Sequence, residues 1–131
     1  MVIPYAELKP MPVTVLVVDD SSMVRRQVSS ALAAAGFHTV EAIDGADALA
    51  KLDAHPDAAL VVCDVNMPRM NGLELLEATR PRRPALPFLM LTTEGQPELI
   101  QSARALGARA WMVKPFKADL LVAAARKLAG A

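Results

Sequence analysis

The chain has 131 residues, of which 53% are hydrophobic and 21% charged, so it suits one globular domain with a buried core rather than a disordered segment. Fourteen Lys and Arg residues balance fourteen Asp and Glu residues, which leaves no net charge to attract nucleic acid or an anionic membrane. No apolar run approaches the roughly 18 to 20 residues of a membrane helix, and the first residues lack a signal-peptide pattern, so we expect a cytoplasmic protein.

The first twelve residues differ in composition from the rest of the chain. Residues 1–12 contain three prolines and no basic stretch followed by an apolar one. Chain ends of this kind are commonly disordered unless they pack on the domain. We therefore expect residues 1–12 to be a flexible extension and residues 13–131 to form a single domain.

From residue 13 onward, short apolar runs alternate with stretches of helical periodicity. The first apolar run, residues 13–18, stops at Asp19, and the helical pattern that begins at Ser21 ends at Gly36. The same alternation predicts further strands over residues 38–42, 59–63, 88–91 and 110–113, and further helices over residues 44–52, 72–79, 98–106 and 117–129.

Five strands that each precede a helix predict an α/β fold with a parallel sheet and helices on both faces. The strands other than residues 38–42 are largely apolar runs, as expected when both faces of a sheet are buried. With right-handed crossovers, the simplest closure is a doubly wound (βα)5 sheet. Of the strand orders common in such sheets, we expect the flavodoxin-like order 2-1-3-4-5. The chain ends soon after the last helical pattern, so we expect no output domain.

Polar residues follow four of the predicted strands at the point where each strand ends. Asp19 and Asp20 follow the first strand, Asp64 the third, Thr92 the fourth and Lys114 the fifth. In open α/β sheets, ligands bind at this edge, close to the point where strand order reverses. For the order 2-1-3-4-5 that point lies between the first and third strands, which carry all three aspartates.

This set of residue types indicates phosphoryl chemistry. Three neighbouring carboxylates repel one another, and a hard dication such as Mg²⁺, which prefers oxygen ligands, relieves that repulsion. Lys114 adds a second positive charge, and two positive centres facing one carboxylate suit phosphoryl transfer. Alone, the Asp pair is typical of a helix N-cap, and the Thr or Lys-Pro of an ordinary turn. Four complementary residue types at four strand ends of one sheet favour the functional interpretation.

The sequence resembles response-regulator receiver domains over about residues 13–129. Four motifs in the order and spacing of that family carry the resemblance: Val17-Val18-Asp19-Asp20, Asp64-Val65-Asn66-Met67-Pro68 with Gly72, Leu91-Thr92, and Lys114-Pro115-Phe116. The stretch Ser21-Ser22-Met23-Val24-Arg25-Arg26 and the short chain are most similar to the stand-alone chemotaxis (CheY-like) type.

The resemblance implies a role for each matching residue of the site. Asp64 would be the phosphoacceptor. Asp20, Asp64 and the backbone carbonyl of Asn66 would ligate Mg²⁺, with Mn²⁺ as an alternative ion, and Asp19 would hold a metal-bound water. Lys114 would contact first the carboxylate and then the phosphoryl oxygens.

The resemblance also implies how the phosphorylated state is read out. Thr92 would move its hydroxyl onto the phosphoryl group and start the switch, and Trp111 occupies the place of the family's switch aromatic. Asn66 and Glu94 stand at positions that tune phosphoryl lifetime, and their identities imply fast self-dephosphorylation. The peptide before Pro115 would be cis, a form that proline tolerates.

The expected function is therefore a switch in a two-component phosphorelay rather than an enzyme with a separate substrate. The donor would be a histidine kinase or a histidine phosphotransfer domain. The target would be a downstream protein such as a flagellar motor switch or another motility component, with no nucleic acid or membrane partner. The cognate kinase, the target, a phosphate-sink role and the oligomeric state stay open at this point.

Three other interpretations fit the sequence less well. A Mg²⁺-dependent phosphohydrolase of the haloacid-dehalogenase type carries Asp-x-Asp after its first strand and usually a cap, whereas Asp19 and Asp20 are adjacent and the chain is short. A nucleotide-binding module needs a glycine-rich turn or a Gly-Lys-Ser/Thr loop, and neither is present. A degenerate receiver acting only as a scaffold would not need the complete set of acidic, hydroxyl and lysine residues.

Overall fold

The structure, a computed structural model, describes residues 2, 4, 12–93 and 97–130. Within these ranges strands and helices alternate along the chain: β1 (Thr14–Val18), α1 (Ser22–Ala34), β2 (His38–Ala42), α2 (Gly45–Ala54), β3 (Ala58–Asp64), α3 (Gly72–Thr79), β4 (Phe88–Thr92), α4 (Pro97–Ala105), β5 (Ala110–Val113) and α5 (Ala118–Ala129). Every predicted element is present, with ends close to those expected. The predicted flexible segment, residues 1–12, lies mostly outside the described residues.

The strands form one parallel sheet in the order β2-β1-β3-β4-β5, so the predicted fold class and strand order are confirmed. The register aligns the carboxyl ends of the central strands: Val18 pairs with Cys63, Asp64 with Leu91, and Thr92 with Val113. The residues that end or directly follow these strands therefore emerge at one edge of the sheet. No helix among the described residues is long and apolar enough to cross a membrane.

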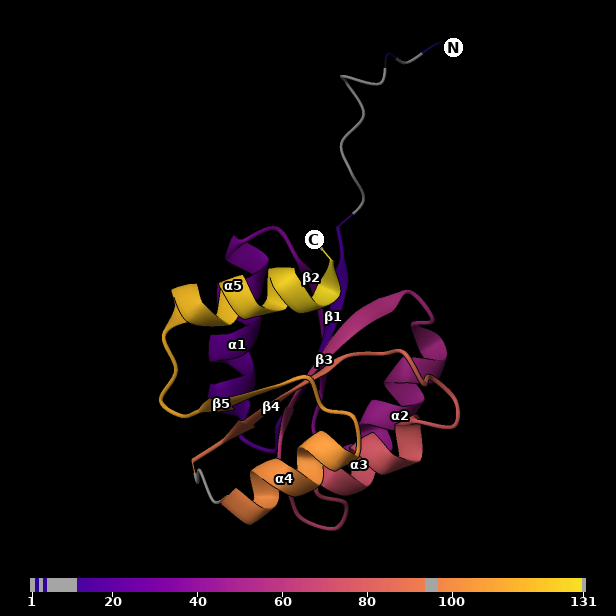
Figure 1. Cartoon of the computed structure of the whole chain (residues 1–131). Helices are drawn as coiled ribbons and strands as arrows, with labels where there is room; N and C mark the ends of the chain where they lie inside the picture. Colours follow the sequence, from indigo (N-terminus) through magenta and orange to yellow (C-terminus); the bar gives the residue numbers. More distant parts are fainter. Residues whose placement is uncertain (1, 3, 5–11, 94–96, 131) are drawn as a thin grey trace.

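Helices cover both faces of the sheet and bury a core on each. α1 and α5 lie on one face, and α2, α3 and α4 lie on the other (Figure 1). Alternate residues of each strand point to opposite faces, so Val15 and Val17 pack with Leu32 of α1 and Leu121 of α5. On the other side, Leu16 and Val18 join the cluster that contains Leu52, Leu75 and Ala103.

Local sequence explains where the helices begin and end. Ser21, Asp44 and Asn71 are N-caps whose side chains accept hydrogen bonds from backbone N–H groups three residues later, which satisfies donors that have no partner inside the helix. Asn71 and Glu74 form a reciprocal capping box. Gly36 has φ of 96° just beyond α1, a conformation that favours glycine.

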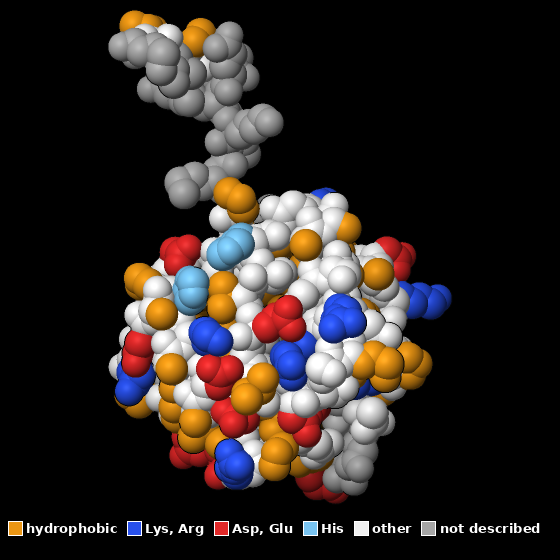
Figure 2. All heavy atoms as spheres, turned by 180° about the vertical axis from the view of Figure 1, so that it is seen from behind, with side chains coloured by type: hydrophobic (Ala, Val, Ile, Leu, Met, Phe, Trp, Pro, Cys, Tyr) orange, Lys and Arg blue, Asp and Glu red, His pale blue; other side chains and the backbone are white. Residues whose placement is uncertain are grey.

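The distribution of charged side chains on the surface agrees with the equal numbers of basic and acidic residues in the sequence. On the face seen from behind the view of Figure 1, basic and acidic side chains are interspersed, and hydrophobic ones lie singly or in small groups between them (Figure 2). This face therefore has no large field of one sign to attract a polyanion.

Candidate functional site

Three acidic residues from distant parts of the chain meet at the carboxyl edge of the sheet. Asp19 and Asp20 directly follow β1, and Asp64 is the last residue of β3. One carboxylate oxygen from each of the three lies within 4.8 Å of the others. Asp19 and Asp64 are buried, whereas Asp20 is exposed. The cluster thus contains two buried carboxylates and one that is exposed to solvent.

Lys114 brings a positive charge into this cluster. Its Nζ donates a hydrogen bond of 3.0 Å to Oδ2 of Asp19 and lies 3.4 Å from Oδ1 of Asp64. The sequence predicted a pair with Asp64, and the structure adds Asp19 as the nearer partner. The Lys114 N–H also donates to the Thr92 carbonyl at 2.7 Å, and the Lys114–Pro115 peptide is cis, as the resemblance implied.

The environment of Asp64 disfavours its negative charge. Burial raises the pKa of this carboxyl group, and the neighbouring negative charge of Asp19 raises it further. The charge of Lys114 and the N–H of Asn66, which donates to Asp64 Oδ1 at 3.3 Å, act in the opposite direction but leave the pKa raised. The site thus holds more negative charge than Lys114 alone offsets.

These residues fit a hard divalent cation. The donor atoms are all oxygen, they lie close together, and the exposed Asp20 leaves the cluster open on one side. The hydrogen bond from Asn66 to Asp64 keeps the Asn66 backbone beside the carboxylates. A bound cation would relieve the repulsion that raises the Asp64 pKa.

Two more predicted residues lie at this edge. Thr92, the last residue of β4, is fully buried, and the Asn66 side-chain amide is 3.4 Å from its hydroxyl oxygen. Asn66 is therefore connected to Asp64 through its backbone and to Thr92 through its side chain. Glu94, the other predicted lifetime residue, lies outside the described residues.

Trp111 is not part of the acidic cluster. It pairs with Met90 in the middle of the β4–β5 ladder, and its side chain packs against the core on the α2–α4 side of the sheet. Its buried Nε1 has no hydrogen-bond partner among the residues that the structure describes. Trp111 also lines a cavity of about 350 Å³ with residues of α4. The predicted switch aromatic thus lies between β5 and α4.

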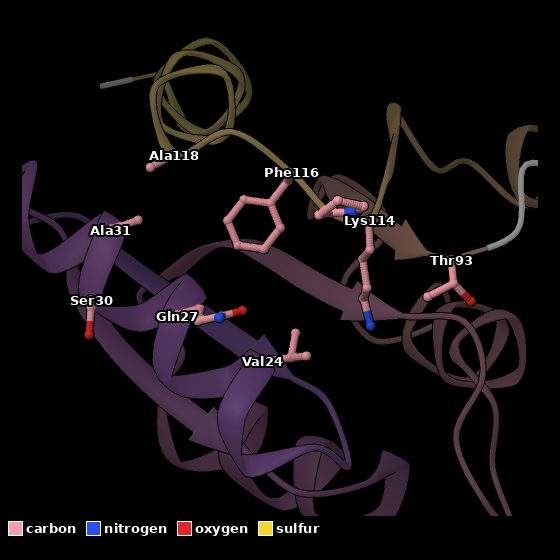
Figure 3. A pocket seen from close by; sticks show the side chains of 9 residues that line it. Val24, Gln27, Ser30, Ala31, Thr93, Lys114, Phe116 and Ala118 are labelled. Carbon is pink, nitrogen blue, oxygen red and sulfur yellow. The ribbon is translucent and has the colours of Figure 1, made fainter.

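An apolar hollow adjoins the site on its other side. This cavity of about 760 Å³ lies between α1 and the segment from β5 to α5, and it is lined by Val24, Gln27, Ser30, Ala31, Thr93, Lys114, Pro115, Phe116 and Ala118. The Phe116 ring occupies its middle, and Lys114 lies at the end nearer Thr93 (Figure 3). The hollow therefore reaches the same lysine that contacts Asp64.

Arg25 is a residue near the site for which the sequence suggested no role. Its Nη1 donates a hydrogen bond of 2.7 Å to the backbone carbonyl of Asp19. An arginine in the first turns of an exposed helix is ordinarily a solvated side chain, so no sequence signal distinguishes it from its neighbour Arg26.

Comparison with known proteins agrees with the motifs and the fold. Residues 15–126 match the family described as response regulator receiver domain. The chain is 41% identical over 109 residues to chemotaxis protein CheY1 of Helicobacter pylori, a match that covers 81% of this chain and 88% of that protein.

Solved structures of similar proteins share the fold. Chemotaxis protein CheY4 of Vibrio cholerae has a TM-score of 0.85 and 40% identity, with 89% of this chain and 98% of that chain covered. A chain of the CheX–CheY–BeF3–Mg²⁺ complex from Borrelia burgdorferi has a TM-score of 0.85 and 27% identity, with 89% of each chain covered. The resemblance to stand-alone chemotaxis regulators, which are signalling switches, is therefore confirmed, and the chain belongs to the response regulator receiver domain family.

Proposed function

We propose that this protein is a single-domain response regulator that accepts a phosphoryl group on Asp64 from a phosphohistidine donor, with Mg²⁺ bound in the acidic cluster. The observation that carries the proposal is the placement of a buried carboxylate beside a lysine ammonium at 3.4 Å, within an oxygen cluster that spans less than 4.8 Å. Such a site combines an acceptor with the positive charge that phosphoryl transfer requires.

The transfer forms one bond and breaks another. A carboxylate oxygen of Asp64 attacks the phosphorus, the new O–P bond forms as the P–N bond of the phosphohistidine breaks, and that electron pair returns to the imidazole nitrogen. Lys114 offsets negative charge on the phosphoryl oxygens from its position beside Asp64. Asp20, Asp64 and the Asn66 carbonyl would hold Mg²⁺, or Mn²⁺, and Asp19 would act through water. When bound, the ion supplies further charge neutralisation at the phosphoryl group.

The switch begins when the new charge recruits Thr92. Phosphorylation adds about 1.5 to 2 negative charges, and the Thr92 hydroxyl moves from its contact with the Asn66 amide toward the phosphoryl oxygens. Trp111 then reports the state of the face formed by α4, β5 and α5. Because its Nε1 lacks a partner among the described residues, a rearrangement that supplies an acceptor changes its environment. Trp111 fluorescence that stays constant on phosphorylation, together with unchanged partner affinity, would contradict this role.

The partners follow from this chemistry. The donor is a histidine kinase or a histidine phosphotransfer domain in the cytoplasm, and the apolar hollow beside Lys114 offers it a surface next to the acceptor. The downstream partner is a motility protein such as a flagellar motor switch, as the chemotaxis names of the relatives suggest. The functional unit is residues 13–131, the range that the sequence predicts to form one domain. Asn66 and Glu94 favour a short phosphoryl lifetime, which a decay time of hours would contradict.

Intact mass spectrometry tests the proposal. The wild-type protein and Asp64→Asn are incubated briefly with Mg²⁺ and phosphoramidate, and each reaction is repeated with a chelator. Gain of one phosphoryl group by the wild type only, lost on chelation, supports both the acceptor and the metal. No gain in either protein, with beryllofluoride binding also absent, would refute the proposal and indicate a binding scaffold.

A further inference from the structure

Arg25 links the acidic cluster to two neighbouring elements. Its side chain is only 15% exposed, and its Nε lies 3.4 Å from a carboxylate oxygen of Glu41 near the end of β2. The same guanidinium donates from Nη1 to the carbonyl oxygen of Asp19 at 2.7 Å. Arg25 thus connects α1, the end of β2 and the connection after β1.

The carbonyl that Arg25 holds belongs to the peptide group that begins Asp20. Because the Asp19 carbonyl and the Asp20 N–H share one planar peptide group, fixing that oxygen restricts the direction in which the Asp20 side chain leaves the backbone. Asp20 needs this support, since no hydrogen bond or ion pair joins its carboxylate to another described residue.

Asp19 is held independently of Arg25. Its side chain accepts hydrogen bonds from the Ser21 N–H at 2.9 Å and from Lys114 at 3.0 Å, and its own N–H donates to the Ala42 carbonyl at 3.2 Å. Loss of Arg25 therefore leaves the Asp19 carboxylate anchored and releases mainly the peptide that leads into Asp20.

Charge and geometry make opposite predictions for Arg25. As a positive charge near the carboxylates, it disfavours a dication, so its removal would tighten metal binding. That charge is offset by Glu41 on the other side of the guanidinium. The hydrogen bond to Asp19 is short and charge-assisted, which makes it stronger than a neutral one. The geometric contribution therefore outweighs the electrostatic one.

We propose that Arg25 is a positioning residue for the metal site, which aims the Asp20 carboxylate by holding the Asp19–Asp20 peptide. This inference rests on the proposed function, because it concerns binding of Mg²⁺ by the same cluster. Groups that orient metal ligands in this way typically change metal affinity by 10- to 100-fold.

Isothermal titration of Mg²⁺ into the unphosphorylated protein tests the role of Arg25. Arg25→Gln is compared with Arg26→Gln, which removes the same charge from the next residue of α1, an exposed one with no bonded partner among the described residues. We expect Arg25→Gln to weaken Mg²⁺ binding about 10-fold and Arg26→Gln to leave it within about twofold, as distant exposed charges are screened. Glu41→Gln, which leaves the Asp19 contact in place, should lose less affinity than Arg25→Gln.

The outcomes separate this inference from the proposed function. Wild-type protein that does not bind Mg²⁺ overturns the proposed function. Wild-type binding with equal or tighter binding by Arg25→Gln overturns the positioning role alone. Circular dichroism establishes that each variant is folded at the titration temperature. If Arg25→Gln is unfolded at that temperature, Arg25→Lys tests the positioning role instead. Lysine keeps the positive charge but cannot contact Glu41 and the Asp19 carbonyl through separate nitrogen atoms. Wild-type affinity in Arg25→Lys would then overturn the inference.

Discussion

Gly72 and Gly45 form a matched pair of sites for a single added methyl group. Each is the first residue of a helix and directly follows an Asx N-cap, Asn71 or Asp44. A Cβ on Gly72 would lie 2.3 Å from the backbone carbonyl oxygen of Asp64, whereas the three nearest atoms to a Cβ on Gly45 would be Sδ, Cγ and Cβ of the Met70 side chain, at 2.5 to 2.8 Å. Gly72→Ala therefore presses on the backbone of the phosphoacceptor, and Gly45→Ala does not.

The structure sets the size of the effect. Ordinary contact begins near 3.4 Å, so the Asp64 carbonyl or α3 must move by 3.4 minus 2.3, about 1.1 Å. Overpacking of a well-packed core costs about 1 to 3 kcal/mol. Replacing glycine by alanine in a helix returns about 0.5 to 1 kcal/mol, a gain that both variants share. Gly45→Ala also has an overpacking cost, because Met70 must move, but its clash involves no backbone atom among the three nearest. We therefore expect Gly72→Ala to be about 1 kcal/mol less stable than Gly45→Ala. A misplacement of about 1 Å at the acceptor should also slow phosphorylation about 100-fold.

Two measurements on both variants test the predicted loss of stability and the predicted loss of phosphorylation rate. Urea unfolding followed by circular dichroism gives the free energy of unfolding, and mass spectrometry with phosphoramidate gives the initial rate of phosphorylation. The reasoning is refuted if Gly72→Ala matches Gly45→Ala in stability and matches the wild type in rate. A stability loss with a normal rate would show that α3, rather than Asp64, gives way to the methyl group.

The remaining predictions concern charges. The native-state pKa of Asp64 is raised above its ordinary value of 3.8, so Asp64 binds its proton more tightly in the folded protein than in the unfolded protein. Ionisation of Asp64 therefore lowers the stability of the fold as the pH rises from the unfolded-state pKa through the native pKa. Without metal, Asp64→Asn should therefore be more stable than the wild type at pH 7, and the difference should shrink as the pH falls toward 4; a pH-independent difference in denaturation experiments would contradict this. Lys114→Gln should reduce the phosphorylation rate about 100-fold while tightening Mg²⁺ binding in calorimetry, and weaker metal binding would contradict the charge argument. Arg80 donates to the backbone carbonyls of Leu86, before β4, and of Leu106 and Gly107, directly after α4, and its guanidinium lies over the Phe88 ring. Arg80→Lys should therefore lose about 2 kcal/mol of unfolding free energy. The control Arg82→Lys changes an exposed ion pair with Asp53 and should lose under about 0.5 kcal/mol of unfolding free energy. Equal losses of unfolding free energy in the two variants would contradict a stabilising role for the Arg80 hydrogen bonds.

Local sequence determined the elements and the edge at which the site lies. Apolar runs that stop at Asp19 and Lys114 define parallel strands, and N-caps such as Asn71 set the helix starts. Parallel strands then bring their carboxyl ends together whatever the details of packing. The structure extends β3 through Asp64 and β4 through Thr92, one residue beyond the predicted ends, because the sheet hydrogen bonds continue to these residues.

The roles of individual residues came from the family resemblance, because spacing alone does not distinguish a phosphoacceptor from a metal ligand. Only the tertiary structure decided which side chains touch. Lys114 reaches Asp19 across 95 residues of sequence, Arg25 reaches back to the Asp19 carbonyl, and the Trp111 Nε1 is left without a partner among the described residues. The physical reason is that hydrophobic periodicity encodes which faces are buried, whereas side-chain contacts depend on strand register and helix rotation. Those are set only when the whole core packs together.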